Sequence, residues 1–383
     1  MRPFPLLVAS MALLAWTPRS GGEEAAIPRV VIDIHIEGLQ SPDENRRERT
    51  FAELKGKPAE LKAVVARLEK AAEEAFQAYR AGPFLKARGE LVQKVRQDYE
   101  AHAAQKKVVG KQFVTAENKP EFLKLVELHQ TYFSGLKSVL AGQQPEERRL
   151  TGLRAAVTAL RAAGGLPPAA LPDVVQIIQE ALPDDVRPFL QEQDRYWAKV
   201  RQVYLWNRDH TPFAKDYHRE AIRVNNDYRL IHGLLPVELE ECLLRAATKH
   251  CEEMAELKYF AHVSPREENK TWDKRIRNEG YKGSPASENL ACAGSATPAT
   301  YAVRSFMQWL WDPHHHPLVN PGINQVGVGL VGGLAGGSYG SSRQWLSANL
   351  DPAPLPFAAL EIDYAVFKRV FSAAGGAGGR TKR

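Results

Sequence analysis

The chain has 383 residues, of which 44% are hydrophobic and 25% are charged, so it has enough apolar material for a core and the length of two ordinary domains. The formal net charge of +6 is mild, and basic and acidic residues are interleaved along most of the sequence. We therefore expect no nucleic-acid partner, which would require a stronger basic bias. Only three cysteines are present (Cys242, Cys251 and Cys292), which excludes a disulfide-rich scaffold because at most one intramolecular bridge can form.

Residues 1–26 are predicted to form a signal peptide. Arg2 precedes a mostly apolar run from Phe4 to Trp16, and small and polar residues follow as far as Ala26. The run is about a dozen residues long, whereas a helix that crosses a bilayer needs about twenty. We therefore expect a secreted, periplasmic or cell-envelope protein without a retained transmembrane helix. An uncleaved anchor is the alternative, because the segment has no clean Ala-x-Ala cleavage site.

The next segment, residues 27–217, is predicted to be a mainly helical domain. It opens with Val30, Ile32, Ile34 and Ile36 in alternation with other residues, which predicts one β-strand. Apolar residues then recur at spacings of three and four, which predicts helices over residues 59–79, 84–107, 119–140, 145–163, 171–181 and 186–206. No fixed-period repeat is present, so an irregular bundle is favoured over a solenoid.

Three histidines, His102, His129 and His210, are scattered along this helical segment. They do not group with cysteines or carboxylates at the spacing of a metal site. We interpret them as exposed or hydrogen-bonded helix histidines. His250, on the apolar stripe of a later predicted helix, is interpreted as a hydrogen-bonded core histidine.

From residue 218 the pattern changes, because helical segments are now joined by loops with Asn, Ser and Pro, and a β-rich segment follows. Paired strands are predicted at Val326, Val328 and Leu330 and, after a glycine loop, at Trp345 and Leu346. Helices followed by strands indicate an α+β fold for residues 218–350. Residues 351–383 form a C-terminal extension, whose glycine-rich basic tail is expected to be disordered.

Five ordered motifs lie in residues 218–350. In chain order they are N-x-x-R followed by G-L-x-P (226–236), Y-F-x-H-x-S-P (259–265), S-E-N-L (287–290), W-x-x-D-P-x-H (309–315) and V-G-V-G (326–329). Together they resemble the CAP superfamily of SCP-like extracellular domains, which includes cysteine-rich secretory proteins, antigen 5 and pathogenesis-related proteins. The resemblance covers about a third of the chain.

The resemblance implies an α-β-α sandwich with a central cleft lined by two histidines and two acids. Carried over motif by motif, these fall on His262, Glu288, Asp312 and His315, with His314 as a competing position for the second histidine. In similar proteins the two histidines can hold a divalent metal such as zinc, which here implies His262 and His315 as ligands. With only two protein ligands such a site would be open, and we do not expect folding to require the metal.

Most of the superfamily acts through binding, including the binding of sterols and other lipids, so the resemblance implies a non-catalytic exported protein. Its cleft would bind a divalent metal, a small or lipid-like ligand of the cell envelope, or both. The alternative is a metal-assisted hydrolase of cell-envelope peptide or glycan, with Glu288 as the base. In a third hypothesis, residues 27–217 dock the protein to an envelope partner. The sequence predicts no oligomeric state.

Overall fold

The computed structural model describes residues 27–39, 43–140, 145–292, 298–311, 315–331, 335–342, 346–349 and 356–372. The predicted signal peptide and the basic tail lie outside these ranges. The described chain forms two compact units. The first combines residues up to 89 with residues 143–182, and the second combines residues 90–142 with residues 183–383.

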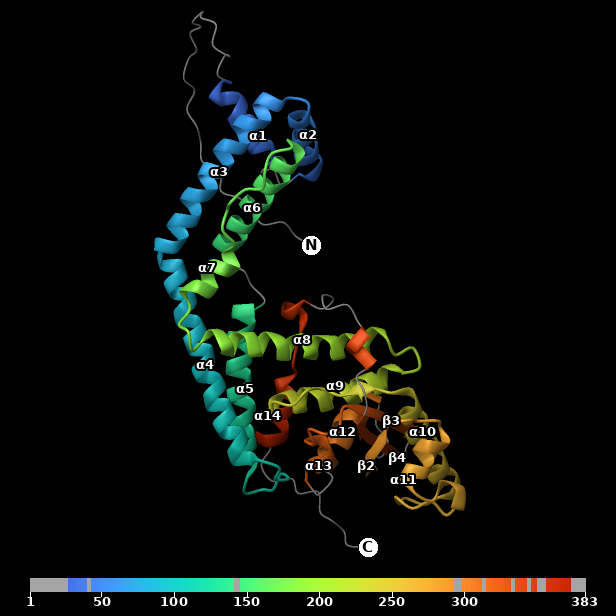
Figure 1. Cartoon of the computed structure of the whole chain (residues 1–383). Helices are drawn as coiled ribbons and strands as arrows, with labels where there is room; N and C mark the ends of the chain where they lie inside the picture. Colours follow the sequence, from blue (N-terminus) through green and yellow to red (C-terminus); the bar gives the residue numbers. More distant parts are fainter. Residues whose placement is uncertain are drawn as a thin grey trace, which may run out of the picture. The chain divides into compact units, whose positions relative to one another are not determined.

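The first unit is built from helices. They are α1 (Arg29–Leu39), α2 (Glu44–Lys55), α3 (Pro58–Ala81), α6 (Pro145–Ala163) and α7 (Val174–Ala181), with the start of α4 (Pro83–Val109) (Figure 1). The apolar faces of α3 and α6 form its core, where Leu61, Leu68 and Phe76 pack in one cluster with Leu150 and Val157. A helical periodicity on each segment is therefore enough to bury one face of each helix.

The strand predicted over residues 30–36 is wrong, because these residues belong to helix α1. Ile32, Ile36 and Leu39 pack against the core of the first unit, whereas Val30 is exposed. Positions four and three apart lie on one face of a helix, so the alternating pattern also suited a helix. The described residues of this unit include no β-strand with which residues 29–39 could pair. Their backbone N–H and C=O groups are hydrogen-bonded along helix α1 instead.

The other helices predicted for the N-terminal half are confirmed. The six periodic segments correspond to α3, α4, α5 (Lys119–Leu140), α6, α7 and α8 (Arg187–Asp209). Helix α5 begins and ends at the predicted residues. Gly82 and Pro83 divide α3 from α4, because proline suits the first turn of a helix but cannot continue one.

The second unit contains a four-stranded sheet between layers of helices (Figure 1). Its strands are β1 (Glu238–Leu239), β2 (Ser284–Ala291), β3 (Gln325–Val331) and β4 (Ala335–Ser342), in the order β1-β3-β4-β2. β1 pairs with β3 in parallel, and the other pairs are antiparallel. Helices α10 (Glu241–Leu257) and α11 (Trp272–Asn278) lie on one side, and α9 (Asp216–Ile231) and α12 (Pro298–Leu310) on the other. This α-β-α sandwich confirms the predicted fold class.

Alternate residues of β3 face the two helical layers. Gly327 faces α10, where a Cβ atom would overlap the helix backbone at Leu243. Val326 and Val328 point the opposite way and pack in one cluster with Ile222 of α9. The glycines of the V-G-V-G motif therefore allow α10 to lie directly on the sheet, while its valines supply the core on the other face.

The partner strand of β3 is not at the predicted place. Leu346 begins a short 3-10 helix (Leu346–Asn349), and Trp345 lies outside the described residues. The glycine-rich segment that was expected to be a loop forms β4 instead, and it pairs with both β2 and β3. Backbone groups make these pairs, so a segment poor in large side chains can still be a central strand. A Cβ on Gly340 would crowd Ser287 and Ile323, which gives one reason for glycine at this position.

The second unit extends beyond residues 218–350 on both sides. Trp206 of α8 donates from Nε1 to the carbonyl of Leu239 in β1 over 3.1 Å. Phe122 of α5 contacts Phe371 of α14 (Tyr364–Ser372), with ring centroids 5.6 Å apart. The C-terminal extension therefore includes a packed helix, and segments on either side of residues 218–350 belong to the same compact unit.

The three cysteines are free thiols. Cys251 is buried in a cluster with Met254 and Leu290, whereas Cys292 is exposed. The sequence allowed one bridge, but packing rather than a disulfide holds these segments together.

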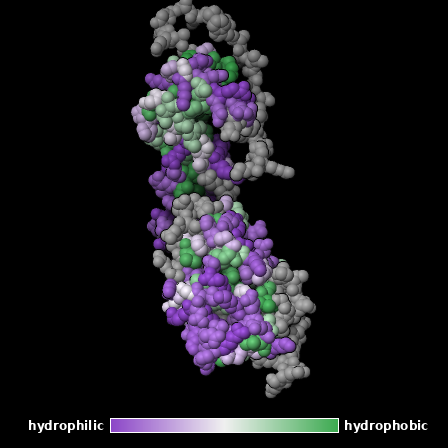
Figure 2. Space-filling model, turned by 90° about the vertical axis from the view of Figure 1, so that its right-hand side faces the viewer, coloured by the Kyte–Doolittle hydropathy of each residue, from purple (hydrophilic) through white to green (hydrophobic). Residues whose placement is uncertain are grey.

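Figure 2 shows a face of the molecule on which hydrophilic residues dominate and apolar residues form small, separate patches. No helix in the described part of the chain has the length and apolar composition needed to cross a membrane. The long helices instead carry apolar residues on one face, which they bury in the two cores.

Candidate functional site

The structure brings two of the predicted site residues together. His262 lies in the loop after α10, and Glu288 lies on β2. The imidazole Nδ1 is 2.5 Å from Glu288 Oε2. The glutamate side chain is 1% exposed and the histidine side chain is 46% exposed. This His262–Glu288 pair therefore presents an imidazole at the surface and holds it from behind with a buried carboxylate.

The loop that carries His262 is held by Glu253, a buried residue of α10. Its carboxylate accepts hydrogen bonds from the Tyr259 hydroxyl at 2.5 Å, from Asn269 Nδ2 at 2.9 Å and from the hydroxyl of Ser264. Helix α10 ends at Leu257, and the next residue, Lys258, adopts the left-handed conformation with φ of 56°. The chain therefore leaves the helix sharply and is tied back on both sides of His262.

Arg275 of α11 completes the buried part of the site. Its Nη2 donates to Glu288 Oε1 at 2.6 Å and to the carbonyl oxygen of His262 at 2.9 Å. The arginine thus neutralises the buried carboxylate and fixes the loop backbone. Arg275 was not among the residues predicted from the sequence, although its position three after Trp272 and one before buried Ile276 places it on the inner side of a short amphipathic helix.

His250 of α10 is a buried neighbour of the pair. Its Nε2 lies 3.1 Å from the Ala261 carbonyl oxygen, and its Nδ1 lies 3.4 Å from the Tyr259 hydroxyl. This confirms the prediction of a hydrogen-bonded core histidine. The ring also lies 3.6 Å from Glu288 Oε1, so it forms part of the wall behind the carboxylate.

The two histidines respond to this environment in opposite ways. The hydrogen bond with Glu288 raises the pKa of His262, and burial opposes it only in part. Burial lowers the pKa of His250, and the positive charge of Arg275 lowers it further. Near neutral pH, His262 is therefore the histidine that more readily carries a positive charge, while His250 stays neutral.

His315, the second predicted histidine, lies in a different environment. It begins the short helix α13 (His315–Leu318) and is fully buried. Its Nε2 lies 2.9 Å from the Tyr228 hydroxyl, and its ring packs against Phe122 and His232. Burial lowers the pKa of His315 to about 4, so the ring is neutral under ordinary conditions.

The sheet separates His315 from the His262–Glu288 pair. In the strand register Glu288 lies opposite Tyr339, and Tyr339 lies opposite Gly327 on β3. Residues paired in this way share one face of a sheet, and Gly327 faces α10, so Glu288 faces α10 and α11. The Tyr228 partner of His315 belongs to α9 on the other side. The structure therefore does not bring the two predicted metal ligands together.

The remaining predicted positions, Asp312 and His314, lie outside the described residues. Within the described ranges, no three side chains of His, Cys, Asp or Glu converge as the ligands of a metal ion would. The donor set does not fit a zinc site of two histidines, because His250, the other imidazole near Glu288, is buried with both ring nitrogens engaged. A buried carboxylate on Nδ1 does match the way proteins orient a ligand-binding imidazole.

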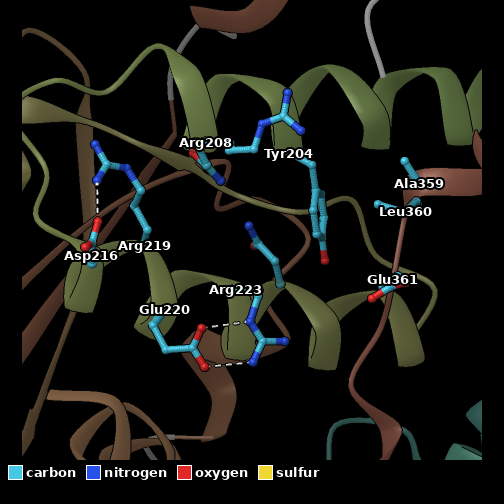
Figure 3. A pocket seen from close by; sticks show the side chains of 11 residues that line it. Tyr204, Arg208, Asp216, Arg219, Glu220, Arg223, Ala359, Leu360 and Glu361 are labelled. Carbon is cyan, nitrogen blue, oxygen red and sulfur yellow. Dashed lines mark hydrogen bonds and ion pairs between the residues drawn. The ribbon is translucent and has the colours of Figure 1, made fainter. Parts of the chain in front are cut away.

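A cavity of ≈ 320 Å³ lies elsewhere in the second unit, between α8, α9 and residues 359–361 (Figure 3). Neither member of the His262–Glu288 pair lines it. Figure 3 shows Glu220 and Arg223 on its wall joined by two hydrogen bonds, of 2.9 and 2.7 Å. The wall holds three arginines and three acidic residues, so its charges give no clear preference for the charge of a ligand (Arg208, Arg219, Arg223, Asp216, Glu220 and Glu361).

The α-β-α sandwich and the loop histidine bonded to the glutamate of an S-E-N-L strand define a class, the SCP-like domains of the CAP superfamily. Residues 222–346 match the family described as "CAP: Cysteine-rich secretory protein family". This segment of the chain is a CAP superfamily domain. The family match and the segment predicted from the sequence agree to within a few residues at each end.

Two known proteins are similar to part of this chain. The uncharacterized protein YkwD of Bacillus subtilis (strain 168) is 29% identical over 115 residues, which are 30% of this chain and 42% of that protein. A crystal structure of an extracellular protein containing an SCP domain from Bacillus anthracis (strain Ames) is 21% identical with a TM-score of 0.29, over 33% of this chain and 40% of that one. The chain thus spans less than half the length of either protein.

Proposed function

We propose that this chain is an extracellular, non-catalytic binding protein whose CAP domain binds an anionic amphiphile at His262. One observation carries the proposal: an exposed imidazole, held by a buried carboxylate, lies in a loop whose apolar side chains at Phe260 and Val263 are also exposed. The family of the domain supports the extracellular location.

The charges of the site favour an anionic head group. The guanidinium of Arg275 balances the carboxylate of Glu288 inside the protein. Protonation of His262, which Glu288 favours, then leaves one positive charge at the surface. A phosphate or carboxylate head group would be attracted by this charge, and its oxygens accept hydrogen bonds from N–H donors.

The loop around His262 favours an apolar tail on the same ligand. Phe260 is 52% exposed and Val263 is 57% exposed, on either side of the histidine in sequence. Single exposed apolar residues are ordinary on protein surfaces, but here they flank a group that carries charge. A ligand with a charged head and a hydrocarbon chain would use both features.

The geometry favours binding over hydrolysis. A general base must reach the proton that it abstracts within about 2.6–3.2 Å. Both carboxylate oxygens of Glu288 are engaged, one by His262 and one by Arg275, and the side chain is buried. Glu288 therefore positions the imidazole instead of acting as the base. His250, the other imidazole near Glu288, is buried with both ring nitrogens engaged, so we include no metal ion in the proposed function.

The test measures the binding of decyl phosphate, below its critical micelle concentration, by isothermal titration calorimetry with the full chain. His262→Gln removes the titrating ring, and His210→Gln, at an exposed histidine of the same unit, is the matched control. Phe260→Ser removes one apolar side chain, and Phe113→Ser, at another exposed phenylalanine, is its control.

We expect His262→Gln to abolish binding, Phe260→Ser to weaken it about tenfold, and both controls to bind as the wild type does. Decanol, which lacks the anionic head, should bind more weakly than decyl phosphate. Wild-type protein that does not bind decyl phosphate, or a His262→Gln variant that binds it unchanged, would overturn the proposal.

A further inference from the structure

A second cavity, of ≈ 140 Å³, lies in the second unit among α4, α5, α8 and the C-terminal end of α9. It shares no lining residue with the cavity of Figure 3, and neither member of the His262–Glu288 pair lines it. One water molecule needs about 10–15 Å³ of this kind of volume, so this cavity has room for a ligand of about ten non-hydrogen atoms. Its wall includes Tyr99, His102, His129, Tyr132, Gln193 and Trp197.

Two buried histidines line this cavity, His102 of α4 and His129 of α5. Their ring centroids lie 4.9 Å apart. His102 Nε2 lies 2.7 Å from the carbonyl oxygen of Ile231, and His129 Nδ1 lies 2.8 Å from the Tyr364 hydroxyl. The second ring nitrogen of each histidine has no hydrogen-bond partner among the described residues. Burial lowers the pKa of His102 to about 4, so its ring is neutral and Nδ1 can accept a hydrogen bond.

Aromatic rings and an amide form another part of the wall. The ring centroids of Tyr99 and Tyr132 lie 5.3 Å apart. The Tyr132 hydroxyl accepts a hydrogen bond from Trp197 Nε1 at 3.1 Å and donates one to Gln193 Oε1. The cavity therefore combines aromatic faces with neutral polar groups that are held in place by buried bonds.

One charge of each sign lies at this cavity. Lys106 and Glu192 are both lining residues, and neither has an ion-pair partner among the described residues. Burial is the main cause that lowers the pKa of His102 and raises the pKa of Tyr99, and the charges of Lys106 and Glu192 add to these two shifts respectively. Both charges thus act on the groups of the wall, and together they leave the cavity without a net charge.

We propose that this cavity binds a neutral, hydroxyl-rich ligand of monosaccharide size. Hydroxyl groups both donate and accept, so such a ligand can satisfy the ring nitrogens of His102 and His129 and bond to Lys106 and Glu192. The carbon face of a sugar ring would lie against the aromatic wall. The inference is independent of the proposed function at His262, because the two sites share no residue.

A free amino acid with an apolar side chain fits less well. Its ammonium and carboxylate groups could pair with Glu192 and Lys106. The side chain would then cover His102 and His129 without bonding to them, and a buried polar group left without a partner costs about 1–3 kcal/mol. This difference separates the two classes of ligand by experiment.

The test is saturation-transfer NMR on the full chain with D-glucose, D-galactose and N-acetyl-D-glucosamine, and with L-phenylalanine as the zwitterionic comparison. Ala103→Leu adds side-chain volume at a lining residue of α4, and Ala104→Leu makes the same change at the next, exposed residue. Lys106→Met and Glu192→Gln remove the charges, with Lys107→Met and Asp194→Asn as exposed controls.

We expect at least one of the three sugars to bind, with a Kd that rises at least about tenfold in Ala103→Leu and is unchanged in Ala104→Leu. Lys106→Met and Glu192→Gln should each weaken binding, which decides the question if Ala103→Leu fails to fold. The proposal is overturned if none of the sugars binds, if the lining variants bind like their controls, or if L-phenylalanine is bound in preference at this cavity.

Discussion

The Nδ1 atom of His262 lies 2.5 Å from Oε2 of Glu288, although the imidazole reaches the surface and the carboxylate is buried. Arg275 bonds to the other carboxylate oxygen and to the backbone of His262. One glutamate thus connects a surface loop, an edge strand and a buried guanidinium. The ionisation of His262 and the position of its loop therefore depend on the same carboxylate.

Glu288→Gln should lower the pKa of His262, because the hydrogen bond to the carboxylate is the main cause that raises it. The folded pKa lies above the unfolded value, so the contact stabilises the fold fully below the unfolded pKa, and this stabilisation is lost as the pH rises through the folded pKa. Binding of an anionic ligand should weaken over the same rise in pH. NMR titration of the ring protons checks this, and an unchanged pKa of His262 in the variant would contradict it.

Arg275→Met should destabilise the second unit by about 3–5 kcal/mol, because it leaves the carboxylate of Glu288 buried without its ion-pair partner. Arg266→Met is the matched control, since Arg266 pairs with the exposed Glu256 and such pairs contribute about 0–1 kcal/mol. Urea unfolding followed by tryptophan fluorescence measures both. Equal decreases in the free energy of unfolding of the two variants would show that the buried ion pair contributes no more to stability than the exposed one.

The second unit should lose stability as the pH falls from about 6.5 toward 4. Burial lowers the pKa of His315 and of His102 to about 4 in each case. As the pH falls, these two histidines are therefore protonated in the unfolded chain at a higher pH than in the folded chain. His315→Phe removes one such group and should reduce the pH slope of the unfolding free energy by up to about 1.4 kcal/mol per pH unit. Urea unfolding over a pH series checks this, with His316→Phe at the exposed neighbour as control. An unchanged slope in His315→Phe would count against the effect.

Residues 218–350 expressed alone should not form the stable sandwich seen in the whole chain. This segment lacks α8, whose Trp206 bonds to β1, and it lacks α5, whose Phe122 packs on His315. The exposed apolar surface should make its thermal unfolding weakly cooperative compared with that of the full chain. Differential scanning calorimetry and the chemical-shift dispersion in NMR spectra of the isolated segment provide the measurement. A cooperative transition at the temperature of the full chain would show that these helices are dispensable.

Zinc analysis should show whether His262 and His315 bind the same metal ion. The sheet places the two imidazoles on opposite faces, so we expect no stoichiometric zinc to remain after exposure to excess metal and desalting. Any weak uptake should depend on His262 and be the same in His315→Ala as in the wild type. One zinc per chain that is lost in both His262→Ala and His315→Ala would show instead that both rings bind one ion.

The sequence determined most of the helices, because the three- and four-residue spacing of apolar side chains is local information. Helix α5 lies where its periodicity predicts it. The alternation of Val30, Ile32, Ile34 and Ile36 suited two structures, and the choice of helix required knowing that Ile32 and Ile36 pack on a helical core. Strand β4 carried no periodic signal, because its glycine-rich sequence contributes backbone hydrogen bonds to the sheet but few large side chains that would mark one face.

The candidate site divides in the same way. The resemblance of the motifs to the CAP superfamily predicted that His262 and Glu288 belong to one site, and the structure brings these two residues into contact. Only the tertiary structure decided that Arg275 bonds to Glu288, that His315 lies across the sheet, and that His102 and His129 come together. These outcomes depend on which faces of distant helices meet, and side-chain burial and hydrogen bonding in the assembled core decide that, whereas local sequence patterns do not.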